Sequence, residues 1–296
     1  MNGILIVDKP TDFTSFDVVA VIRKTLHEKK TGHTGTLDPM ATGVLPILLG
    51  NATKVQQYLS DTDKEYICSF KFGITTDTLD ITGKIINEYP ANVTLNQIED
   101  ILSKFRGDIL QKPPMYSAVS KNGVRLYELA RKGIEIEREA RPVTISKLEL
   151  LEFDESTQCG KLQIACSKGT YIRVICDDIG KELQCGCVMT ALRRTKACGF
   201  DEGQAIPLQN VRELGPDGVI PYIKPVESIF AHIPQINITE KQAFRFSNGG
   251  NLMLSRLKDI PDKTNDTLYR VCYQDKFIGL GSIDTENDEL KFEKKF

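Results

Sequence analysis

Apolar and polar positions recur with two different periods in the first part of the chain, which predicts both strands and helices. Residues 4–7 form a short apolar run typical of a strand. Between residues 18 and 26 the apolar side chains share one helical face, and Thr14 or Ser15 precedes them as an N-cap. Residues 66–72 alternate between apolar and polar side chains, which is the period of a strand.

The middle of the chain continues this mixed pattern. A Thr-x-x-Gln capping box starts the helix predicted over residues 94–105. Residues 143–151 and 161–166 predict two further strands. Thr170 is placed to cap a helix whose apolar stripe runs from residue 172 to residue 183. The pattern therefore predicts a fold that mixes strands and helices.

A change in composition divides the chain near its last quarter. Residues 207–225 are rich in glycine and proline, and we place a domain boundary at residue 225. The larger part is then 1–225, and the smaller part is 226–296. Within the smaller part, the pattern predicts a short capped helix and a hairpin over residues 268–280.

Residues 113–141 interrupt the periodic pattern of the larger part. They contain a Pro-Pro pair, a Lys-Asn-Gly turn and a highly charged stretch, with little apolar periodicity. A loop of this length is uncommon in a compact domain unless it is functional or disordered. We expect an exposed insertion that contacts a substrate, and a surface loop with one short helix is the alternative.

Charge does not mark the whole chain as a nucleic-acid binder. Its 296 residues include 38 Lys and Arg against 40 Asp and Glu, a net charge of -2. Any RNA site must therefore be a local basic patch. Residues 161–200 provide one candidate, because this segment contains seven Lys and Arg but three Asp and Glu. A solvated helix face would have a similar composition.

The remaining composition limits the compartment and the cofactors. No apolar run approaches the ~20 residues that cross a bilayer, and the N-terminus lacks the features of a signal peptide, so we expect a cytoplasmic protein. The eight cysteines are scattered, which favours reduced thiols. Cys176, Cys185, Cys187 and Cys198 leave a zinc site as an alternative, but their spacing is not that of paired C-x-x-C motifs.

The segment GHTGTLDPMATGVLP, residues 32–46, holds one carboxylate, Asp38, among three glycines and two prolines. Glycine allows sharp bends and close approach, and Pro39 restricts the backbone after the carboxylate. We therefore expect a loop that directs Asp38 at a substrate. An ordinary Asp-Pro turn is the plain alternative. The glycine spacing differs from phosphate-binding and dinucleotide-binding loops.

This segment resembles the GHTGTLDPxAxGxLP signature of the TruB family of tRNA pseudouridine synthases, whose aspartate is catalytic. Five further blocks match motifs of the family in the same order. They are Asp8-Lys9-Pro10 with Thr14-Ser15, Asp63-Lys64-Glu65-Tyr66 with Gly73, Gln111 to Val119 with Gly123 and Arg125 to Tyr127, Cys166 to Arg173, and Leu192 to Thr195. The chain departs from the family at Asp12, where glycine is usual, and at Cys185 to Val188, where GCGA is more frequent.

The resemblance implies catalytic roles for four residues. Asp38 would act on the target uridine while its N-glycosidic bond is broken, and uracil would rejoin the ribose through carbon. Attack on the base, attack on the sugar and proton abstraction from the sugar all stay open. Arg173 would pair with Asp38, and Asp80 would be a further partner in this network. Tyr66 would stack on the extruded base, although its place on a face with two phenylalanines is also typical of a core residue.

The resemblance also implies substrate contacts. His33 would insert into the RNA loop, and Leu192, expected on a helix, would line the uracil pocket. Lys9 and Gly35 belong to the same binding set. Arg125, Arg131 and Lys132 lie in the insertion at about 113–141, which resembles the family's thumb loop, and would contact phosphates.

Taken together, the resemblance implies an α+β protein with a mixed, largely antiparallel sheet, the pseudouridine synthase fold, followed by a small β-rich PUA-like RNA-binding domain. The expected activity is conversion of uridine 55 in the TΨC loop of tRNA to pseudouridine, after base flipping. We expect tRNA as the partner, a monomer, no guide RNA, no membrane, and neither metal nor organic cofactor, because the reaction involves no redox change. A guide-RNA-directed synthase and an RNA folding helper are the alternatives.

Overall fold

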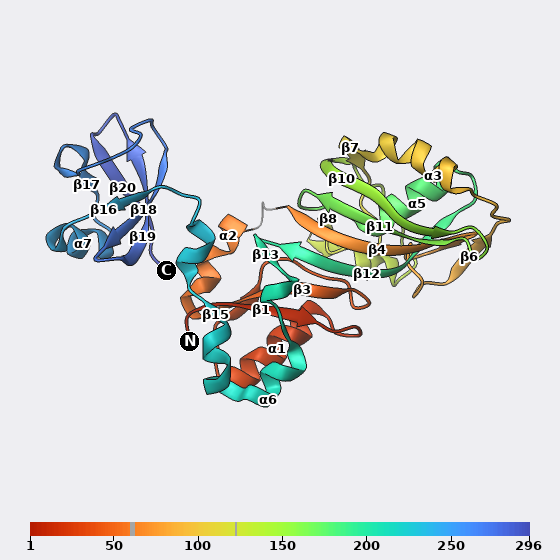
Figure 1. Cartoon of the computed structure of the whole chain (residues 1–296), viewed down its shortest axis with the longest axis horizontal. Helices are drawn as coiled ribbons and strands as arrows, with labels where there is room; N and C mark the ends of the chain where they lie inside the picture. Colours follow the sequence, from red (N-terminus) through yellow and green to blue (C-terminus); the bar gives the residue numbers. More distant parts are fainter. Residues whose placement is uncertain (60–62, 122) are drawn as a thin grey trace.

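An eleven-stranded sheet dominates the computed structural model, which describes residues 1–59, 63–121 and 123–296 (Figure 1). The main row of strands is β14 (Ile206–Pro207), β1 (Gly3–Lys9), β3 (Thr42–Leu49), β12 (Cys187–Ala197), β4 (Lys64–Phe72), β11 (Cys159–Cys166), β10 (Arg141–Asp154) and β7 (Gly107–Gln111). Three short strands pair with strands inside this row, namely β2 (Thr31–His33) with β3, β13 (Phe200–Asp201) with β12 and β15 (Ile223–Lys224) with β1.

Most neighbours in this sheet are antiparallel, but two pairs are parallel. One is β1 with β14, and the other is a short contact of β3 with β12. In the second pair, Thr42 lies opposite Arg193 and Gly43 lies opposite Arg194. The α+β expectation with a mixed, largely antiparallel sheet is therefore confirmed. The β3–β12 contact joins two antiparallel halves and lies directly after the Asp38 loop.

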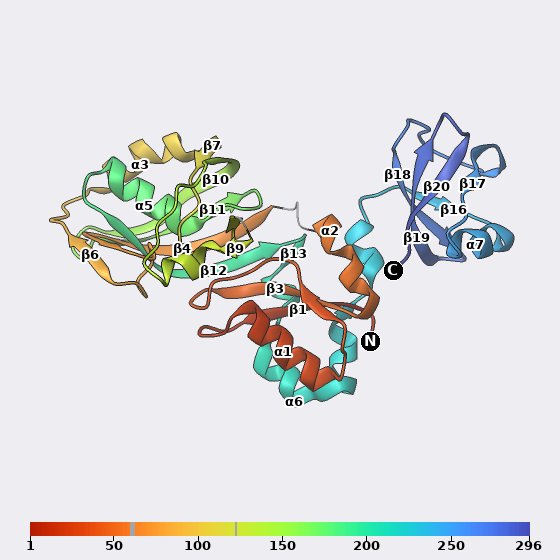
Figure 2. The same ribbon diagram turned by 180° about the vertical axis from the view of Figure 1, so that it is seen from behind.

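Helices cover the sheet in two groups (Figures 1 and 2). One group, beside β1 and β3, consists of α1 (Ser15–Leu26) and α6 (Leu208–Val219), which contact each other. The other group, beside β4, β10 and β12, consists of α3 (Leu95–Leu102) and α5 (Ile172–Glu182). A 3-10 segment, η1 (Gly50–Val55), and the short α2 (Gln56–Leu59) follow β3.

Alternating side chains of the first strands enter two different cores. Leu5 and Val7 of β1 pack with the helices in the main cluster, whereas Ile4 and Ile6 pack on the other face. That second cluster includes Phe230, which comes from the 3-10 helix η5 (Val226–Phe230). A strand buried on both sides reads as a continuous apolar run, which explains the unbroken pattern at residues 4–7.

The predicted capping residue is observed at the start of α1 but not at the start of α5. Thr14 caps α1, because its Oγ1 accepts a hydrogen bond of 3.0 Å from the N–H of Asp17. The prediction of Thr170 as the cap of α5 is wrong. The Thr170 hydroxyl donates instead to the carbonyl of Ser167, and the capping residue is Tyr171.

The expected helix around Leu192 is also wrong, because this residue lies in β12. Leu192 faces Cys68 of β4, and Arg194 faces Tyr66 two positions further along. The strand is held between β3 and β4, so tertiary pairing decides its conformation. Two register shifts interrupt the pairing of β12 with β4, which obscures the alternation in the sequence.

The end of the chain forms a second sheet of five strands. Their order is β16 (Gln235–Asn237), β18 (Leu268–Tyr273), β19 (Lys276–Asp284), β20 (Glu289–Lys294) and β17 (Leu252–Met253). Helix α7 (Glu240–Ser247) and this sheet share their own apolar cluster. Phe230 contacts Phe277 and Phe296 in the cluster that joins this part to η1 and β3. The boundary at residue 225 stays a prediction.

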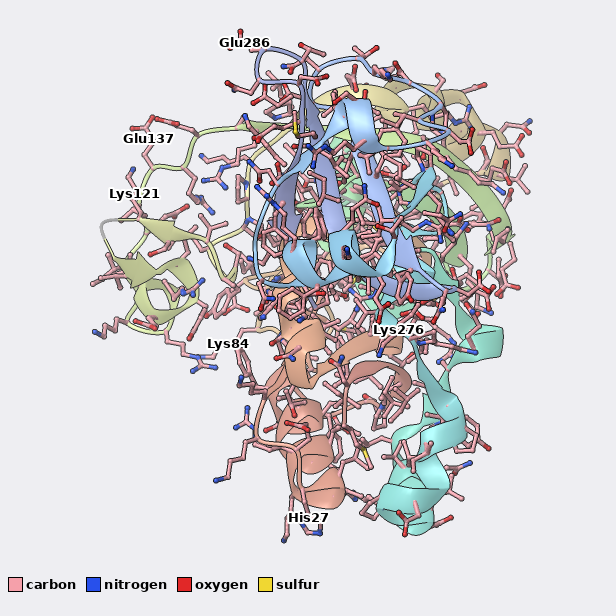
Figure 3. All side chains as sticks on the ribbon, turned by 90° about the vertical axis from the view of Figure 1, so that its left-hand side faces the viewer. His27, Lys84, Lys121, Glu137, Lys276 and Glu286 are labelled. Carbon is pink, nitrogen blue, oxygen red and sulfur yellow. The ribbon has the colours of Figure 1, made fainter. Side chains whose placement is uncertain are left out.

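The insertion at 113–141 contains a small hairpin and one short helix. Strands β8 (Ser120–Lys121) and β9 (Val124–Arg125) pair, and α4 (Leu126–Ala130) follows. Figure 3 shows this segment, which carries Lys121 and Glu137, beside the rest of the molecule. A second small hairpin pairs β5 (Ile74–Thr76) with β6 (Ile85–Glu88). Among the described residues, no helix is both long and apolar enough to cross a membrane.

Candidate active site

The Asp38 loop connects β2 to β3 and is fastened to the start of α1. Ser15 Oγ accepts a hydrogen bond of 2.9 Å from the N–H of Leu37, and lies 3.4 Å from the Leu37 carbonyl, to which it can donate. Ala41 N–H donates to the carbonyl of Asp38 over 3.0 Å, which closes a tight turn. The backbone on both sides of the carboxylate is therefore held by local hydrogen bonds.

Lys9 fixes the same loop through hydrogen bonds to backbone carbonyls. Its side chain is fully buried, and Nζ donates to the carbonyls of Pro10, Phe13 and Pro39 at 2.8, 2.6 and 3.1 Å. Burial lowers the pKa of Lys9 to about 8, although neighbouring carboxylates, Asp12 first among them, oppose the shift. With all three ammonium protons donated inside the protein, Lys9 acts on the loop and does not face a ligand.

Arg173 joins three segments at the carboxylate. Its Nε lies 3.3 Å from Oδ2 of Asp38, while Nη1 and Nη2 donate to the carbonyls of Thr78 and Tyr116 at 3.1 and 2.6 Å. Arg173 is 5% exposed, whereas the Asp38 side chain is 38% exposed. A fixed positive charge therefore supports a carboxylate that a substrate can still reach.

Asp80 is linked to Arg173 through an intervening residue, Thr78. Its Oδ1 accepts hydrogen bonds from Thr78 Oγ1 at 2.8 Å and from Thr82 N at 3.0 Å. It is buried, and these contacts shape the turn that presents the Thr78 carbonyl to Arg173. We expected Asp80 to be a further partner in the network of Asp38 and Arg173. The contacts recorded for its side chain are with Thr78 and Thr82, so it supports the arginine indirectly.

Tyr66 and Leu192 come from neighbouring strands, β4 and β12, and both side chains are almost completely buried. Tyr66 belongs to the main apolar cluster, as the core interpretation predicts, and its stacking role stays a prediction. Burial raises the pKa of the Tyr66 hydroxyl, and the guanidinium of Arg194 opposes this shift. The phenol therefore stays protonated at neutral pH.

Arg194 is the main residue that the sequence did not single out as part of the site. It is 1% exposed, and its Nε and Nη2 donate to the carbonyls of Val44 and Gly35 at 2.7 and 3.2 Å. A Cβ on Gly43, whose φ is +103°, would lie 2.2 Å from the Arg194 carbonyl oxygen. Gly43 thus allows two strands to meet. The available signal was its place in the matched block Leu192 to Thr195.

His33 and Phe16 form an aromatic pair next to this loop. Their ring centroids are 5.3 Å apart, and the rings are nearly perpendicular, at 84°. Burial lowers the pKa of His33, and Arg194 adds to the effect. The imidazole is therefore neutral at neutral pH.

Tyr171 is a second residue that the sequence did not single out. The Cζ of Arg173 lies 5.8 Å from the centre of its ring. The Gln111 side chain fixes its backbone, accepting from Tyr171 N at 2.8 Å and donating to its carbonyl at 3.1 Å. Burial raises the pKa of the Tyr171 hydroxyl. Its place in the matched block that ends at Arg173 was the available signal.

Comparison with known proteins shows to which family the chain belongs. The family model described as TruB family pseudouridylate synthase (N terminal domain) matches residues 23–172, and the model for the tRNA pseudouridylate synthase B C-terminal domain matches residues 173–231. The chain belongs to the TruB family of pseudouridylate synthases. The alignments with its relatives extend over nearly the whole chain.

The relatives of this TruB chain include two bacterial proteins named tRNA pseudouridine synthase B. The protein from Clostridium tetani is 44% identical over 98% of both chains, and the one from Stutzerimonas stutzeri is 41% identical over 96% of this chain and 92% of the relative. A solved structure, the crystal structure of a Cbf5-Nop10-Gar1 complex, matches with a TM-score of 0.74 and 27% identity. It covers 99% of this chain and 84% of that one.

The insertion of this TruB chain borders the site and carries the three expected phosphate ligands. Arg131 and Lys132 are exposed, and the Arg131 guanidinium lies 5.4 Å from the centre of the Tyr127 ring. Arg125 is also exposed and donates to the carbonyl of Ala118. A cleft of about 570 Å³ lies between the insertion and α5. Its lining includes Pro113, Tyr116, Ile134, Arg138, Val174 and Asp177.

Most cations of the basic segment 161–200 have carboxylate partners. Arg173 pairs with Asp38, and four other cations pair with carboxylates. These pairs are Lys161 with Glu152, Lys181 with Asp177 and Asp178, Arg193 with Asp8 and Glu202, and Lys196 with Glu65. In this TruB chain, the pair of Arg173 with Asp38 belongs to the site, and an RNA-binding role for the segment stays a prediction.

Proposed function

We propose that this chain is a tRNA pseudouridine synthase that isomerises uridine 55 of the TΨC loop, with Asp38 as the catalytic carboxylate. The observation that carries the proposal is the pairing of a half-exposed Asp38 with a buried Arg173 in a chain of this family. The names of the relatives from Clostridium tetani and Stutzerimonas stutzeri support tRNA as the substrate.

The reaction is an isomerisation, so it needs no oxidant and no second reactant. The bond between N1 of uracil and C1′ of the ribose breaks, and a bond between C5 and C1′ forms. The hydrogen on C5 leaves as a proton, and N1 gains one. Asp38 takes part by attack on the base, attack on the sugar or abstraction of a sugar proton, and all three need a carboxylate that is ionised and exposed. Arg173 keeps it oriented in each case.

The uridine must leave its stack to reach Asp38. Extruding a base costs unstacking and unpairing energy, which the enzyme repays through contacts to the flipped base. We assign stacking on the base to Tyr66 and the wall of the uracil pocket to Leu192. His33 would occupy the RNA loop beside the displaced nucleotide, and Gly35 and Lys9 would keep the surrounding loop in shape.

Binding of the rest of the tRNA is assigned to two other parts of the chain. The insertion at 113–141 would act as a thumb on the stem-loop, with Arg125, Arg131 and Lys132 at phosphates. Residues 226–296 would form a PUA-like RNA-binding domain. We propose that the enzyme works in the cytoplasm as a monomer and without a guide RNA, as expected for a stand-alone tRNA enzyme.

The test follows the hydrogen on C5. An unmodified tRNA transcript carrying 5-tritiated uridine is incubated with wild type and with Asp38→Asn, and tRNA binding is measured in parallel. A transcript with cytidine at position 55 is the substrate control. We expect tritium release by wild type only, and only when uridine 55 is present, with tRNA bound by both proteins.

Other outcomes would change the assignment. Release by Asp38→Asn would remove the catalytic role of the carboxylate. Release from the cytidine transcript would move the target to another uridine. If neither protein releases tritium although both bind and refold tRNA, the chain is an RNA folding helper.

A further inference from the structure

Phe16 is a large aromatic side chain that lies in water beside the candidate site. It sits in the first turn of α1 and is 73% exposed. A single exposed apolar residue is common on protein surfaces and means little alone. Phe16 differs because its ring packs edge-to-face on His33, at the mouth of the Asp38 loop.

The position of the Phe16 ring relative to Asp38 is set by a short rigid path. Ser15, its neighbour in the chain, bonds to the backbone of Leu37, which is the neighbour of Asp38. The capping box of Thr14 and Asp17 fixes the helix start around it. A contact made by Phe16 would therefore be made at a defined distance from the carboxylate.

The exposed face of α1 runs from Phe16 through Ala20 to two cations, Arg23 and Lys24, at helical spacing. Two further exposed cations, Lys29 and Lys30, lie just beyond the helix. Arg23 Nη2 also donates to the carbonyl of Thr31, on the strand that carries His33. Phe16 and Arg23 are about 10 Å apart along the helix axis, roughly the rise of three stacked nucleotides.

Two carboxylates lie beside this face. Asp17 accepts hydrogen bonds from the N–H and hydroxyl of Thr14 and keeps its negative charge, whereas the charge of Glu28 is paired with the amino group of Met1 at 2.6 Å. The cations of this face, Arg23, Lys24, Lys29 and Lys30, outnumber these carboxylates. The face thus combines one aromatic ring at the site with positive charge further away. This is the pattern of surfaces that bind single-stranded nucleic acid, where bases stack on aromatic rings and cations follow the backbone.

We propose that Phe16, supported by His33, stacks on a nucleobase of the tRNA loop next to the extruded uridine, and that Arg23 and Lys24 hold phosphates of the same strand. The inference rests on the proposed function. When a uridine leaves the loop, its former neighbours lose a stacking partner, and an aromatic ring at the mouth of the site replaces it.

The test compares Phe16→Ala with Phe16→Trp, and uses Tyr222→Ala as the control. Tyr222 is an aromatic residue that is 44% exposed at the end of the 3-10 helix η4 (Ile220–Tyr222), outside the candidate site and the assigned RNA contacts. Because both aromatic side chains are exposed, we expect melting temperatures close to that of wild type. Phe16→Ala should weaken tRNA binding about 5- to 150-fold, which corresponds to one lost base stack, whereas Phe16→Trp and Tyr222→Ala should bind like wild type.

Salt and fluorescence separate stacking from charge. Replacing Arg23 and Lys24 by Gln should lower the slope of log Kd against log salt by about 1 for each contact, while Phe16→Ala should leave the slope unchanged. With 2-aminopurine placed in turn at the loop positions, wild type should change the fluorescence at one position next to uridine 55. Phe16→Ala should abolish that change.

The proposal is overturned if Phe16→Ala binds tRNA as tightly as wild type, or if Tyr222→Ala loses the same affinity. Binding and fluorescence do not require turnover. Absence of tritium release by wild type would therefore reject the proposed function, while the stacking contact would still be judged by its own readout.

Discussion

The Nε of Arg173 lies 3.3 Å from Oδ2 of Asp38, and the two other nitrogens of the same guanidinium donate to the carbonyls of Thr78 and Tyr116. One buried side chain thus links the loop before β3, the turn after β5 and the root of the insertion. A change in any of these segments would be transmitted to the carboxylate through a rigid planar group.

Arg173→Ala should reduce turnover far more than tRNA binding. Loss of a fixed charge beside the reacting groups typically lowers kcat by roughly 10²- to 10³-fold. Arg173→Lys should restore only part of it, because an ammonium group cannot serve three acceptors in the same planar geometry. Steady-state kinetics and a separate binding assay check this.

Arg212→Ala is the matched control for this change. Its guanidinium also lies 5.8 Å from an aromatic ring, that of Phe13, but on the exposed side of α6. We expect this variant to keep the wild-type kcat. An Arg173→Ala enzyme with the same kcat as wild type would remove Arg173 from the reaction.

Neutralising Arg131 and Lys132 together should weaken tRNA binding and flatten its salt dependence. Each lost phosphate contact lowers the slope of log Kd against log salt by about 1. The control replaces Lys147 and Lys161, exposed cations that already pair with Glu149 and Glu152. Equal slopes for wild type and the insertion variant would place the RNA elsewhere.

Lys9 should make the free energy of unfolding increase as the pH rises in the alkaline range. Its pKa in the folded protein is about 8, below its ordinary value of 10.5. Between these values the unfolded chain binds more protons than the folded one, so the contribution of Lys9 to the unfolding free energy rises with pH. Below pH 8 the cost of burying the ammonium charge is fully present.

Lys9→Met provides the reference, because methionine does not titrate. The unfolding free energy of wild type minus that of Lys9→Met should stay constant below about pH 8 and rise up to about pH 10.5. Denaturant unfolding at a series of pH values measures it. A difference that stays constant up to about pH 10.5 would show that folding does not lower the pKa of Lys9.

Asp12→Gly should stabilise the protein by about 0.5–1 kcal/mol. Asp12 has φ of 62°, in the left-handed region that favours glycine, and its N–H donates to the Pro39 carbonyl. Glycine keeps that hydrogen bond and removes the strain. Asp12→Ala should destabilise it, because alanine lacks the local hydrogen bonds that help aspartate in this region. Thermal unfolding should therefore rank glycine above aspartate and aspartate above alanine.

The local order of residues was sufficient to predict the Asp38 loop, a cap of α1 at Thr14 or Ser15, the apolar strand at residues 4–7 and the insertion. Each depends on neighbours within a few positions, where backbone preference and side-chain period act directly. The same information gave the family resemblance, because its motifs are short and ordered. It also brought Asp38 and Arg173 into one hypothesis, although no periodicity relates them.

Tertiary structure alone decided how distant segments meet. Leu192 and Arg194 lie in a strand because β3 and β4 pair with it, and no local preference required this. Arg194 is buried under Gly35 only because Gly43 lets β3 approach β12. The cations of residues 161–200 pair both with nearby carboxylates, as Lys181 does with Asp177, and with distant ones, as Arg193 does with Asp8 and Arg173 with Asp38. Sequence thus determined the chemistry that each segment carries, and long-range pairing and burial decided which groups share a site.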